Sequence, residues 1–189
     1  MDDIGVVDES TWFYQQVVKR RVAWGFALAL VFLVFADPSR TSVLFGFWIA
    51  LAGEALRTWS SGTLVKNEQL TTEGPYQLTR NPLYVGNFLL GVGVAVMGGA
   101  LWLLIVFALF FWAVYQALIL KEEKRMLERY GEEFRSYCRE VPRFFPRLEA
   151  WPPAAVPYDP RRMWQIHKEW KAWLALYAVT LYLALRASW

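Results

Sequence analysis

The chain has 189 residues, of which 56% are hydrophobic, 17% aromatic and 20% charged, and its mean hydropathy is +0.23. Its 11 Trp, 9 Tyr and 13 Phe exceed what the core of one small domain shields from water. This composition excludes an ordinary water-soluble domain and predicts a lipid bilayer as the second solvent. The net charge of +3 suits membrane lipids better than nucleic acid, which we do not expect as a partner. A single cysteine, Cys138, and a single histidine, His167, exclude an internal disulfide and a multi-histidine site, so no metal is expected.

Apolar segments at residues 22–36 and about 41–59, and one at about 168–187, are each expected to cross the bilayer. They are shorter than about 20 uncharged residues, so interfacial Trp and snorkelling Lys and Arg must extend them. The acidic N-terminus lacks the positive charge and the cleavage site of a secretory signal, and we therefore expect the first segment to be retained.

The most informative stretch is residues 81–120, 40 positions without a charged side chain. One straight helix of that length would extend about 60 Å, about twice the thickness of a hydrocarbon core of about 30 Å. The stretch therefore predicts a tight helical hairpin with arms at about 82–96 and 101–120 and a Gly-rich turn at 97–100. Together these segments predict an all-α, polytopic membrane protein with about five transmembrane helices, forming a single domain over residues 1–189.

The charges flanking these segments predict their orientation. Basic residues 19–21 precede the first segment, so we expect a cytoplasmic N-terminus. Counting crossings then places residues 60–80 and 121–171 on the cytoplasmic side, and the second of these holds 12 Lys and Arg. From Lys121 apolar residues recur every three to four positions, which predicts a cytoplasmic amphipathic helix that continues the hairpin and ends before Pro142. We expect a Pro-rich connector at 152–160 to lead to the last segment.

Glu122 and Glu123 lie where the hairpin leaves the membrane. They fit a solvated interfacial charge cluster. They also fit a site in which one carboxylate, partly desolvated, accepts hydrogen bonds from ribose hydroxyls or an amine, or attracts a sulfonium cation. Adjacent helical residues diverge by about 100°, so both carboxylates are not expected to face one ligand equally.

Residues 74–86 form a second candidate site. Asn81 and Pro82 suit the N-cap and the first position of a helix, and Arg80 precedes them. Arg80 could simply anchor the helix at the membrane surface. A helix N-terminus beside a guanidinium also predicts an anion site, either for the carboxylate of an amino-acid-like cofactor or for a lipid phosphate.

Two further patterns lie within the apolar segments. Gly91 and Gly93 are not followed by the third glycine of a dinucleotide loop, so they fit helix packing or close approach to a cofactor. Glu54 and Arg57 are three residues apart and can pair on one helix face, as a structural staple or as a functional intramembrane ion pair.

These motifs, in order and spacing over residues 53–146, resemble the superfamily of integral membrane methyltransferases that includes isoprenylcysteine carboxyl methyltransferases and phospholipid N-methyltransferases. The residues that carry the resemblance are Leu56-Arg57-Thr58-Trp59-Ser60, Gly74-Pro75-Tyr76, Arg80-Asn81-Pro82-Leu83-Tyr84-Val85-Gly86, Glu122-Glu123, Tyr130-Gly131-Glu132-Glu133-Phe134 and Val141-Pro142-Arg143-Phe144-Phe145-Pro146. Members with isoprenylcysteine activity usually have histidine where Asn81 stands, so a mechanism that needs an imidazole there is not expected. The C-terminal segment lies outside the motif region.

The resemblance implies S-adenosylmethionine as methyl donor, bound on the cytoplasmic side, and a lipophilic acceptor that enters from the bilayer. The residues it implies for the cofactor are Tyr76, Arg80, Asn81, Pro82, Tyr84, Gly86, Gly91, Gly93, Glu122 and Glu123. Arg80, Glu123 and Glu54 are the residues expected to take part in catalysis. A carboxylate acceptor needs no base, whereas a lipid amine must lose a proton, for which Glu54 or Glu123 would be the candidate base.

The expected activity is O-methylation of an isoprenylcysteine-type carboxylate, with N-methylation of a phospholipid ethanolamine headgroup as the alternative. A related membrane reductase that uses a nicotinamide cofactor, or a membrane scaffold or lipid-binding protein without enzymatic activity, are the competing interpretations. The residues leave the acceptor and the oligomeric state open.

Overall fold

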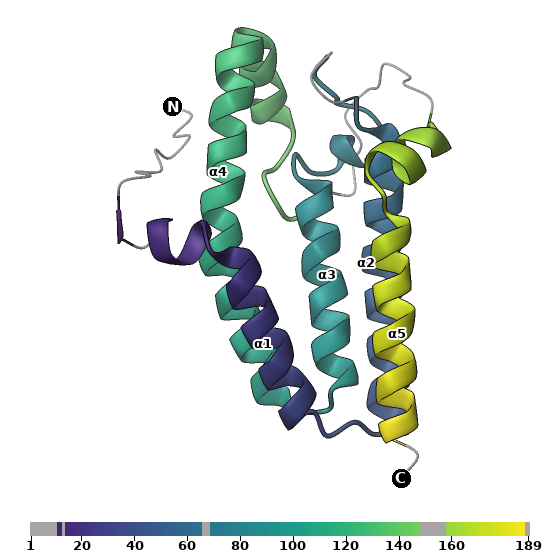
Figure 1. Cartoon of the computed structure of the whole chain (residues 1–189). Coiled ribbons are helices and arrows are strands. Elements are labelled where there is room, and N and C mark those ends of the chain that lie inside the picture. Colours follow the sequence, from purple (N-terminus) through teal and green to yellow (C-terminus); the bar gives the residue numbers. More distant parts are fainter. Residues whose placement is uncertain (1–10, 13, 66–68, 148–157, 188–189) are drawn as a thin grey trace.

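A computed structural model describes residues 11–12, 14–65, 69–147 and 158–187, and within these ranges the secondary structure is entirely helical (Figure 1). The long helices are α1 (Arg21–Phe35), α2 (Arg40–Thr63), α3 (Pro82–Met97), α4 (Leu101–Glu140) and α5 (Trp170–Arg186). Three short helical turns complete the fold: η1 (Tyr14–Val18), η2 (Gly74–Gln77) and η3 (Arg162–Ile166). The all-helical class is confirmed for these residues, and the five predicted apolar segments each form a helix.

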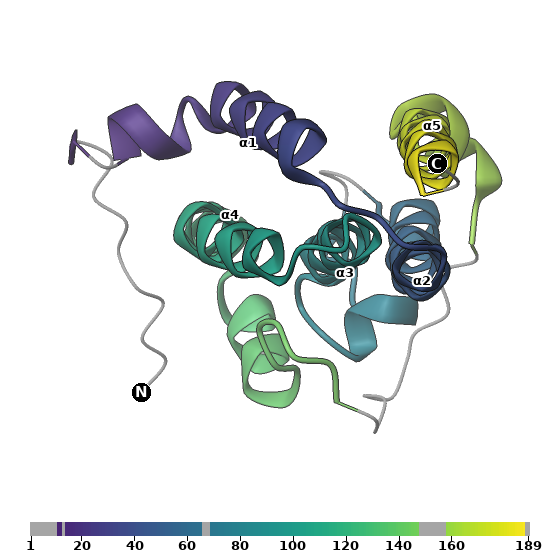
Figure 2. The ribbon, with the colours of Figure 1, turned by 90° about the horizontal axis from the view of Figure 1, so that it is seen from below.

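The helices form a bundle with α3 near its centre. Figures 1 and 2 show α4 on one side of α3 and α2 on the other, with α5 beside α2 and α1 over α4. Helices α2 and α3 approach closely through small residues: a Cβ on Gly93 would lie 2.3 Å from the Ala50 backbone nitrogen, and one on Gly53 would lie 2.7 Å from the Gly86 carbonyl oxygen. Such contacts are typical of helices that associate without a hydrophobic driving force between them.

The predicted hairpin is confirmed as a pair of helices, α3 and α4, joined at residues 98–100. Gly99 adopts a positive φ of 76°, and a Cβ there would lie 2.0 Å from the Asp37 carbonyl oxygen. The Asp37 amide in turn donates a 2.7 Å hydrogen bond to the Gly98 carbonyl. The hairpin turn is thus pinned to the loop between α1 and α2.

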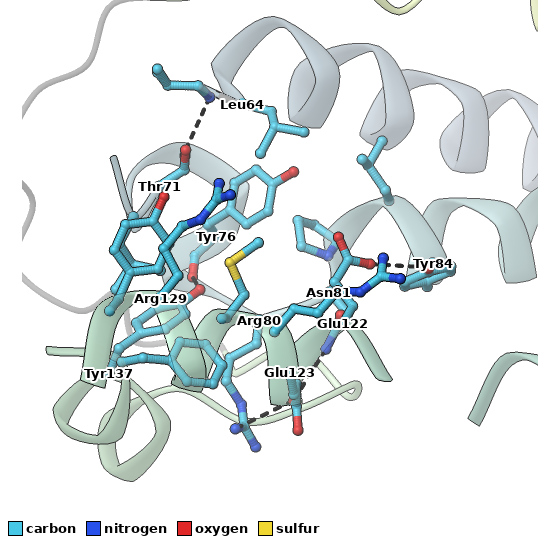
Figure 3. Close-up of a pocket in the computed structure, with 18 of the residues that line it drawn as sticks. Leu64, Thr71, Tyr76, Arg80, Asn81, Tyr84, Glu122, Glu123, Arg129 and Tyr137 are labelled. Carbon is cyan, nitrogen blue, oxygen red and sulfur yellow. Dashed lines mark hydrogen bonds and ion pairs between the residues drawn. The ribbon is translucent and has the colours of Figure 1, made fainter. Parts of the chain in front are cut away.

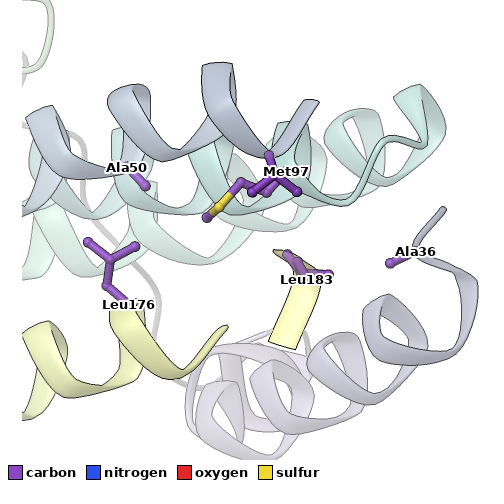
Figure 4. Close-up of a cluster of buried hydrophobic side chains, with 6 residues drawn as sticks. Ala36, Ala50, Met97, Leu176 and Leu183 are labelled. Carbon is purple, nitrogen blue, oxygen red and sulfur yellow. The ribbon is translucent and has the colours of Figure 1, made fainter. Parts of the chain in front are cut away.

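A hydrophobic cluster closes the bundle at this end. It joins the α1–α2 loop, α2, the end of α3 and α5 (Figure 4). Its buried members are Ala36, Val43, Ala50, Met97, Leu176 and Leu183. The polar residues discussed below lie at the opposite end of the helices.

Most of the outer surface is apolar. Helix α1 has no buried residue, and Phe26, Leu30 and Leu109 are 74%, 65% and 68% exposed. Judged by length and hydropathy, α4 is the one helix among the described residues that is long enough and apolar enough to cross a membrane. Helices α1 and α3 are apolar but shorter. The predicted number of crossings therefore stays a prediction. The exposure of so many apolar side chains is typical of a surface that contacts lipid or another protein.

The predicted amphipathic helix does continue the hairpin and ends at Glu140, before Pro142, as expected. It is however interrupted at Gly131, whose φ of 53° and ψ of −120° reverse the chain, so residues 132–140 fold back along the part of α4 that directly precedes Gly131 (Figure 1). Phe134, Tyr137 and Val141 then pack against Leu70. Of the Pro-rich connector, residues 152–157 lie outside the described residues.

We predict that Gly131→Ala destabilises the protein by about 1–3 kcal/mol, because an L-residue at this φ and ψ is strained. The measurement is the thermal unfolding midpoint of the detergent-purified protein. Gly25→Ala is the matched control: Gly25 is helical with nothing within 4 Å of the added Cβ, so alanine is expected to leave stability unchanged or raise it by up to about 1 kcal/mol. Equal midpoints for the two variants would contradict the role of Gly131 in reversing the chain.

Candidate functional site

A cavity of about 800 Å³ lies at the end of the bundle that carries the polar segments (Figure 3). It is lined by residues from α2, from 64–65 and 69–71, from η2, the start of α3 and the second half of α4, and by two residues just before α5. The lining includes Arg57, Tyr76, Arg80, Asn81, Pro82, Tyr84, Asn87, Glu122, Glu123, Arg125, Arg129, Tyr130, Tyr137, His167 and Glu169. Both predicted motifs, residues 74–86 and Glu122-Glu123, therefore meet in one place.

Glu123 is the centre of a buried ionic network. Its side chain is 4% exposed, and it lies 3.3 Å from Arg80 Nη1 and 2.9 Å from Arg143 Nε. Asn81 Nδ2 also donates to Glu123 Oε1 at 3.4 Å. Two guanidinium groups and an amide thus compensate one buried carboxylate, which fixes the start of α3 against α4 and the segment that follows α4.

Residues 142–147 are hydrogen-bonded to residues 78–80 beside this network. The Arg80 amide donates to the Pro142 carbonyl at 2.9 Å, and the Arg147 amide donates to the Leu78 carbonyl at 3.0 Å. Thr79 Oγ1 adds hydrogen bonds to the carbonyls of Arg143 and Phe144. Arg143 belongs to the motif region but was absent from the predicted site, because no local pattern indicates that a residue 20 positions after Glu123 returns to it.

Asn81 differs from its expected role. Pro82 does begin α3, but the Asn81 side chain forms no hydrogen bond that caps the helix. Instead its Nδ2 donates to Glu123 and, at 3.0 Å, to the Arg143 carbonyl. The predicted N-cap position of Asn81 is therefore confirmed, but the side-chain cap is absent, and the side chain binds Glu123 and Arg143 through Nδ2.

The two adjacent glutamates have different surroundings, as the helical geometry predicts. Glu122 is exposed, and its Oε2 accepts a 3.1 Å hydrogen bond from the Tyr84 hydroxyl, whereas Glu123 is buried in the ionic network. Figure 3 shows these two carboxylates pointing in different directions, Glu122 toward Tyr84 and Glu123 toward Arg80. Glu122 is therefore the carboxylate with fewer protein partners.

Two tyrosines form a rigid wall. The Tyr137 hydroxyl donates a 2.6 Å hydrogen bond to the Tyr76 carbonyl, and both side chains are buried. Burial raises the pKa of Tyr76 well above its usual value, and the nearby Glu122 adds to that shift. Burial likewise raises the pKa of Tyr137, against an opposing effect of Arg80. Both phenols therefore stay neutral at physiological pH. Tyr137 was not among the predicted site residues.

Three glycines expected near a cofactor lie elsewhere. Gly86 contacts Arg57 and Gly53, Gly93 contacts Ala50, and Gly91 faces Phe107. None of the three is part of the cavity lining. The structure thus places them at helix–helix contacts, which was the alternative interpretation of these residues.

The ion pair of Glu54 and Arg57 is confirmed, with Glu54 Oε2 3.2 Å from Arg57 Nε. Arg57 reaches the cavity, but Glu54 is fully buried and does not line it. Arg57 also pairs with Glu169 of α5 at 2.7 Å. The sequence carried no signal for Glu169, because the partners are 112 positions apart.

The fold and cavity define an all-helical protein with an apolar outer surface and a charged cavity at one end of its bundle. Residues 56–133 match the sequence model of the phospholipid methyltransferase family. This match and the similarity to isoprenylcysteine O-methyltransferases both support the superfamily of membrane methyltransferases that the sequence motifs resemble.

Curated relatives resemble this chain over part of its length. The nickel-cobalt-cadmium resistance protein NccN of Alcaligenes xylosoxydans xylosoxydans is 43% identical over 83 residues, which cover 44% of this chain and 38% of the relative. The cobalt-zinc-cadmium resistance protein CzcN of Cupriavidus metallidurans is 40% identical over 102 residues, covering 54% and 44%. The protein-S-isoprenylcysteine O-methyltransferase of Schizosaccharomyces pombe is 27% identical over 120 residues, covering 64% and 49%. The chain thus spans less than half the length of each of these relatives. No solved structure matches it.

We predict that Glu123→Gln lowers the free energy of unfolding by about 3 kcal/mol, because it leaves two guanidinium groups without their buried carboxylate. The family resemblance alone would predict that this substitution weakens cofactor binding and leaves stability nearly unchanged. The measurement is thermal unfolding in detergent, with Glu132→Gln as control, since Glu132 forms an exposed ion pair with Arg135 and is expected to contribute less than about 1 kcal/mol. Equal stability of the two variants would contradict the structural role of Glu123.

Proposed function

We propose that this chain transfers a methyl group from S-adenosylmethionine to a lipophilic acceptor in the membrane. The observation that carries the proposal is the meeting of Arg80, the start of α3 and the glutamates 122 and 123 around one cavity, within the residues that match the family. Similarity to the superfamily implies S-adenosylmethionine as the methyl donor. The residues that line the cavity can therefore be compared with the chemical groups of this donor.

The lining fits the chemical groups of that donor. Its carboxylate requires cationic partners, which Arg80, Arg125 and Arg129 supply. Arg80 Nε is buried and has no hydrogen-bond partner among the described residues, so a donor remains for a ligand oxygen. The amino group and ribose hydroxyls require acceptors, for which Glu122 is placed on the cavity wall beside Tyr84.

The bound donor would supply an electrophilic methyl group on a sulfonium. In this proposal the chain binds and orients the reactants and excludes water. Such positioning accounts for much of the acceleration of a reaction between two bound molecules. The ionic network of Glu123 holds Arg80 in place, and Tyr76 and Tyr137 form a wall that stays neutral and does not rearrange. A carboxylate acceptor is already a nucleophile and needs no base.

Two acceptor classes stay open. The similarity to isoprenylcysteine O-methyltransferases supports a prenylcysteine-type carboxylate, and the match to the phospholipid methyltransferase family supports a phospholipid amine. Glu54, the expected base for an amine, lies behind Arg57 and outside the cavity lining. We therefore expect Glu54 to position Arg57.

We further propose that the five long helices cross the bilayer, with the N-terminus and the cavity on the cytoplasmic side. The exposed apolar faces of α1, α4 and α5 support this arrangement. The basic residues of the second half of α4 lie at the cavity end, as the positive-inside rule requires of a cytoplasmic segment.

The test is calorimetric titration of the detergent-purified protein with S-adenosylmethionine and S-adenosylhomocysteine. We expect micromolar binding by the wild type. Glu122→Gln should weaken it by about tenfold, the loss of one charge-assisted hydrogen bond, with the unfolding midpoint unchanged because Glu122 is exposed. Glu132→Gln, on the same helix but outside the cavity lining, should bind like the wild type.

The competing interpretations give other results. A reductase would bind a nicotinamide cofactor and not S-adenosylmethionine, and a scaffold would bind neither. Folded protein that binds no S-adenosylmethionine with or without added lipid would overturn the proposal.

A further inference from the structure

The cavity has a second charged end that the proposed donor site does not use. Arg57 of α2, Asn87 of α3, and His167 and Glu169 at the start of α5 line it there. Helices α2 and α5 lie on the opposite side of α3 from α4 (Figures 1 and 2). These residues are therefore separated by the first turns of α3 from Glu122 and Arg129, which belong to α4.

Arg57 donates hydrogen bonds from its two Nη atoms, and its Nε forms an ion pair with Glu54 without hydrogen-bond geometry. Its Nε lies 3.2 Å from Glu54, its Nη2 lies 2.7 Å from Glu169, and its Nη1 donates to the Asn87 side-chain oxygen. Both carboxylates are buried, so the guanidinium cannot swing without leaving one of them uncompensated. The orientation of the Arg57 guanidinium in the cavity is thus fixed by its partners. Glu169 occupies its Nη2 edge.

The chain docks the start of α5 at this place through several contacts. Trp173, about one turn after Glu169, donates its Nε1 to Oγ1 of Thr58 at 3.0 Å, and Thr58 directly follows Arg57 in α2. The Asp159 amide donates to the Gly62 carbonyl at 3.0 Å, and Tyr158 packs so closely on Gly62 that a Cβ there would lie 2.1 Å from its ring. This segment lies outside residues 56–133, so the family match does not account for its role.

The position also suits a ligand that arrives from the bilayer. Below Arg57 the helices α2, α3 and α5 are apolar and pack through Ala50, Met97 and Leu176. Charged side chains at such a level of a membrane bundle are costly and commonly mark a substrate site. An acceptor whose hydrocarbon part stays in the lipid would place its polar head group at the level of Arg57 and Glu169.

We propose that Arg57, Asn87, His167 and Glu169 form the subsite for the polar head group of the lipophilic acceptor, and that Glu169 sets which head-group charge the subsite prefers. The inference rests on the proposed function and deepens it. Glu169 occupies an edge of the guanidinium that an anionic head group would otherwise bind, and it attracts a cationic one. Glu169 is thus a specificity-determining residue supplied by the C-terminal helix.

The experiment compares wild type and Glu169→Gln with two acceptors, a farnesylated cysteine with a free carboxylate and a phosphatidylethanolamine with an ammonium group. An acceptor that is not methylated is measured as a competitive inhibitor. We expect the variant to bind the carboxylate about five- to tenfold more tightly and the amine about five- to tenfold more weakly, by KM or Ki, because the subsite becomes more positive by one charge. The Kd for S-adenosylmethionine should stay within about twofold.

Two control variants separate charge from structure. Glu169→Asp keeps the charge and should retain the wild-type preference. Trp173→Phe removes a neighbouring hydrogen bond between α5 and α2 without changing charge, and it should leave both acceptor constants within about twofold. If Glu169→Gln fails to fold, Arg57→Lys is compared in its place. It keeps the charge of the subsite but loses the planar guanidinium, so it should weaken carboxylate binding and leave amine binding within about twofold; unchanged carboxylate binding would contradict the subsite.

The outcomes distinguish the two proposals. Donor binding without any charge-dependent shift, or equal shifts for both acceptors, overturns the subsite and leaves the methyltransferase proposal standing. A wild type that binds no S-adenosylmethionine overturns the methyltransferase proposal itself. An altered donor Kd in Glu169→Gln would also overturn the inference, because the two ends of the cavity would then not be separate.

Discussion

The burial of one carboxylate organises the cavity. Glu123 has lost nearly all contact with solvent, and a buried ion must be paired if the fold is to be stable. Arg80 and Arg143 provide that pairing. Arg80 lies two residues before the start of α3, and Arg143 lies in the chain after α4. Three segments must therefore converge on one point. The convergence also brings Asn81 into contact with Glu123, and Thr79 into contact with the Phe144 carbonyl.

The convergence depends on a reversal of the chain. Arg143 can return to Glu123 because Gly131 turns residues 132–140 back along α4. A residue with a side chain would be strained in the backbone conformation of Gly131. The same reversal places Tyr137 against Tyr76. A conformational property of one residue and an electrostatic requirement of another thus act together, and neither alone would form the wall of the cavity.

A second ionic network gives the opposite end of the cavity its shape. Arg57 connects α2, α3 and α5 through Glu54, Asn87 and Glu169, in a part of the bundle whose remaining contacts are apolar. The bundle thus places two rigid guanidinium groups on either side of α3. This arrangement is consistent with the proposed reaction, in which a polar cofactor and a lipophilic acceptor would arrive from different solvents.

The sequence by itself determined the helical class, the hairpin, the end of α4 before Pro142 and the pairing of Glu54 with Arg57, because each follows from neighbouring residues. It also brought Arg80, Asn81 and the two glutamates into one predicted site. Only the tertiary structure decided that the Asn81 side chain binds Glu123 and does not cap its helix, and that Gly86, Gly91 and Gly93 pack helices. It also decided that Arg143 returns to Glu123 and that Tyr137 and Glu169 line the cavity. These outcomes depend on ion pairs and packing between segments far apart in the chain, and local periodicity carries no record of such contacts.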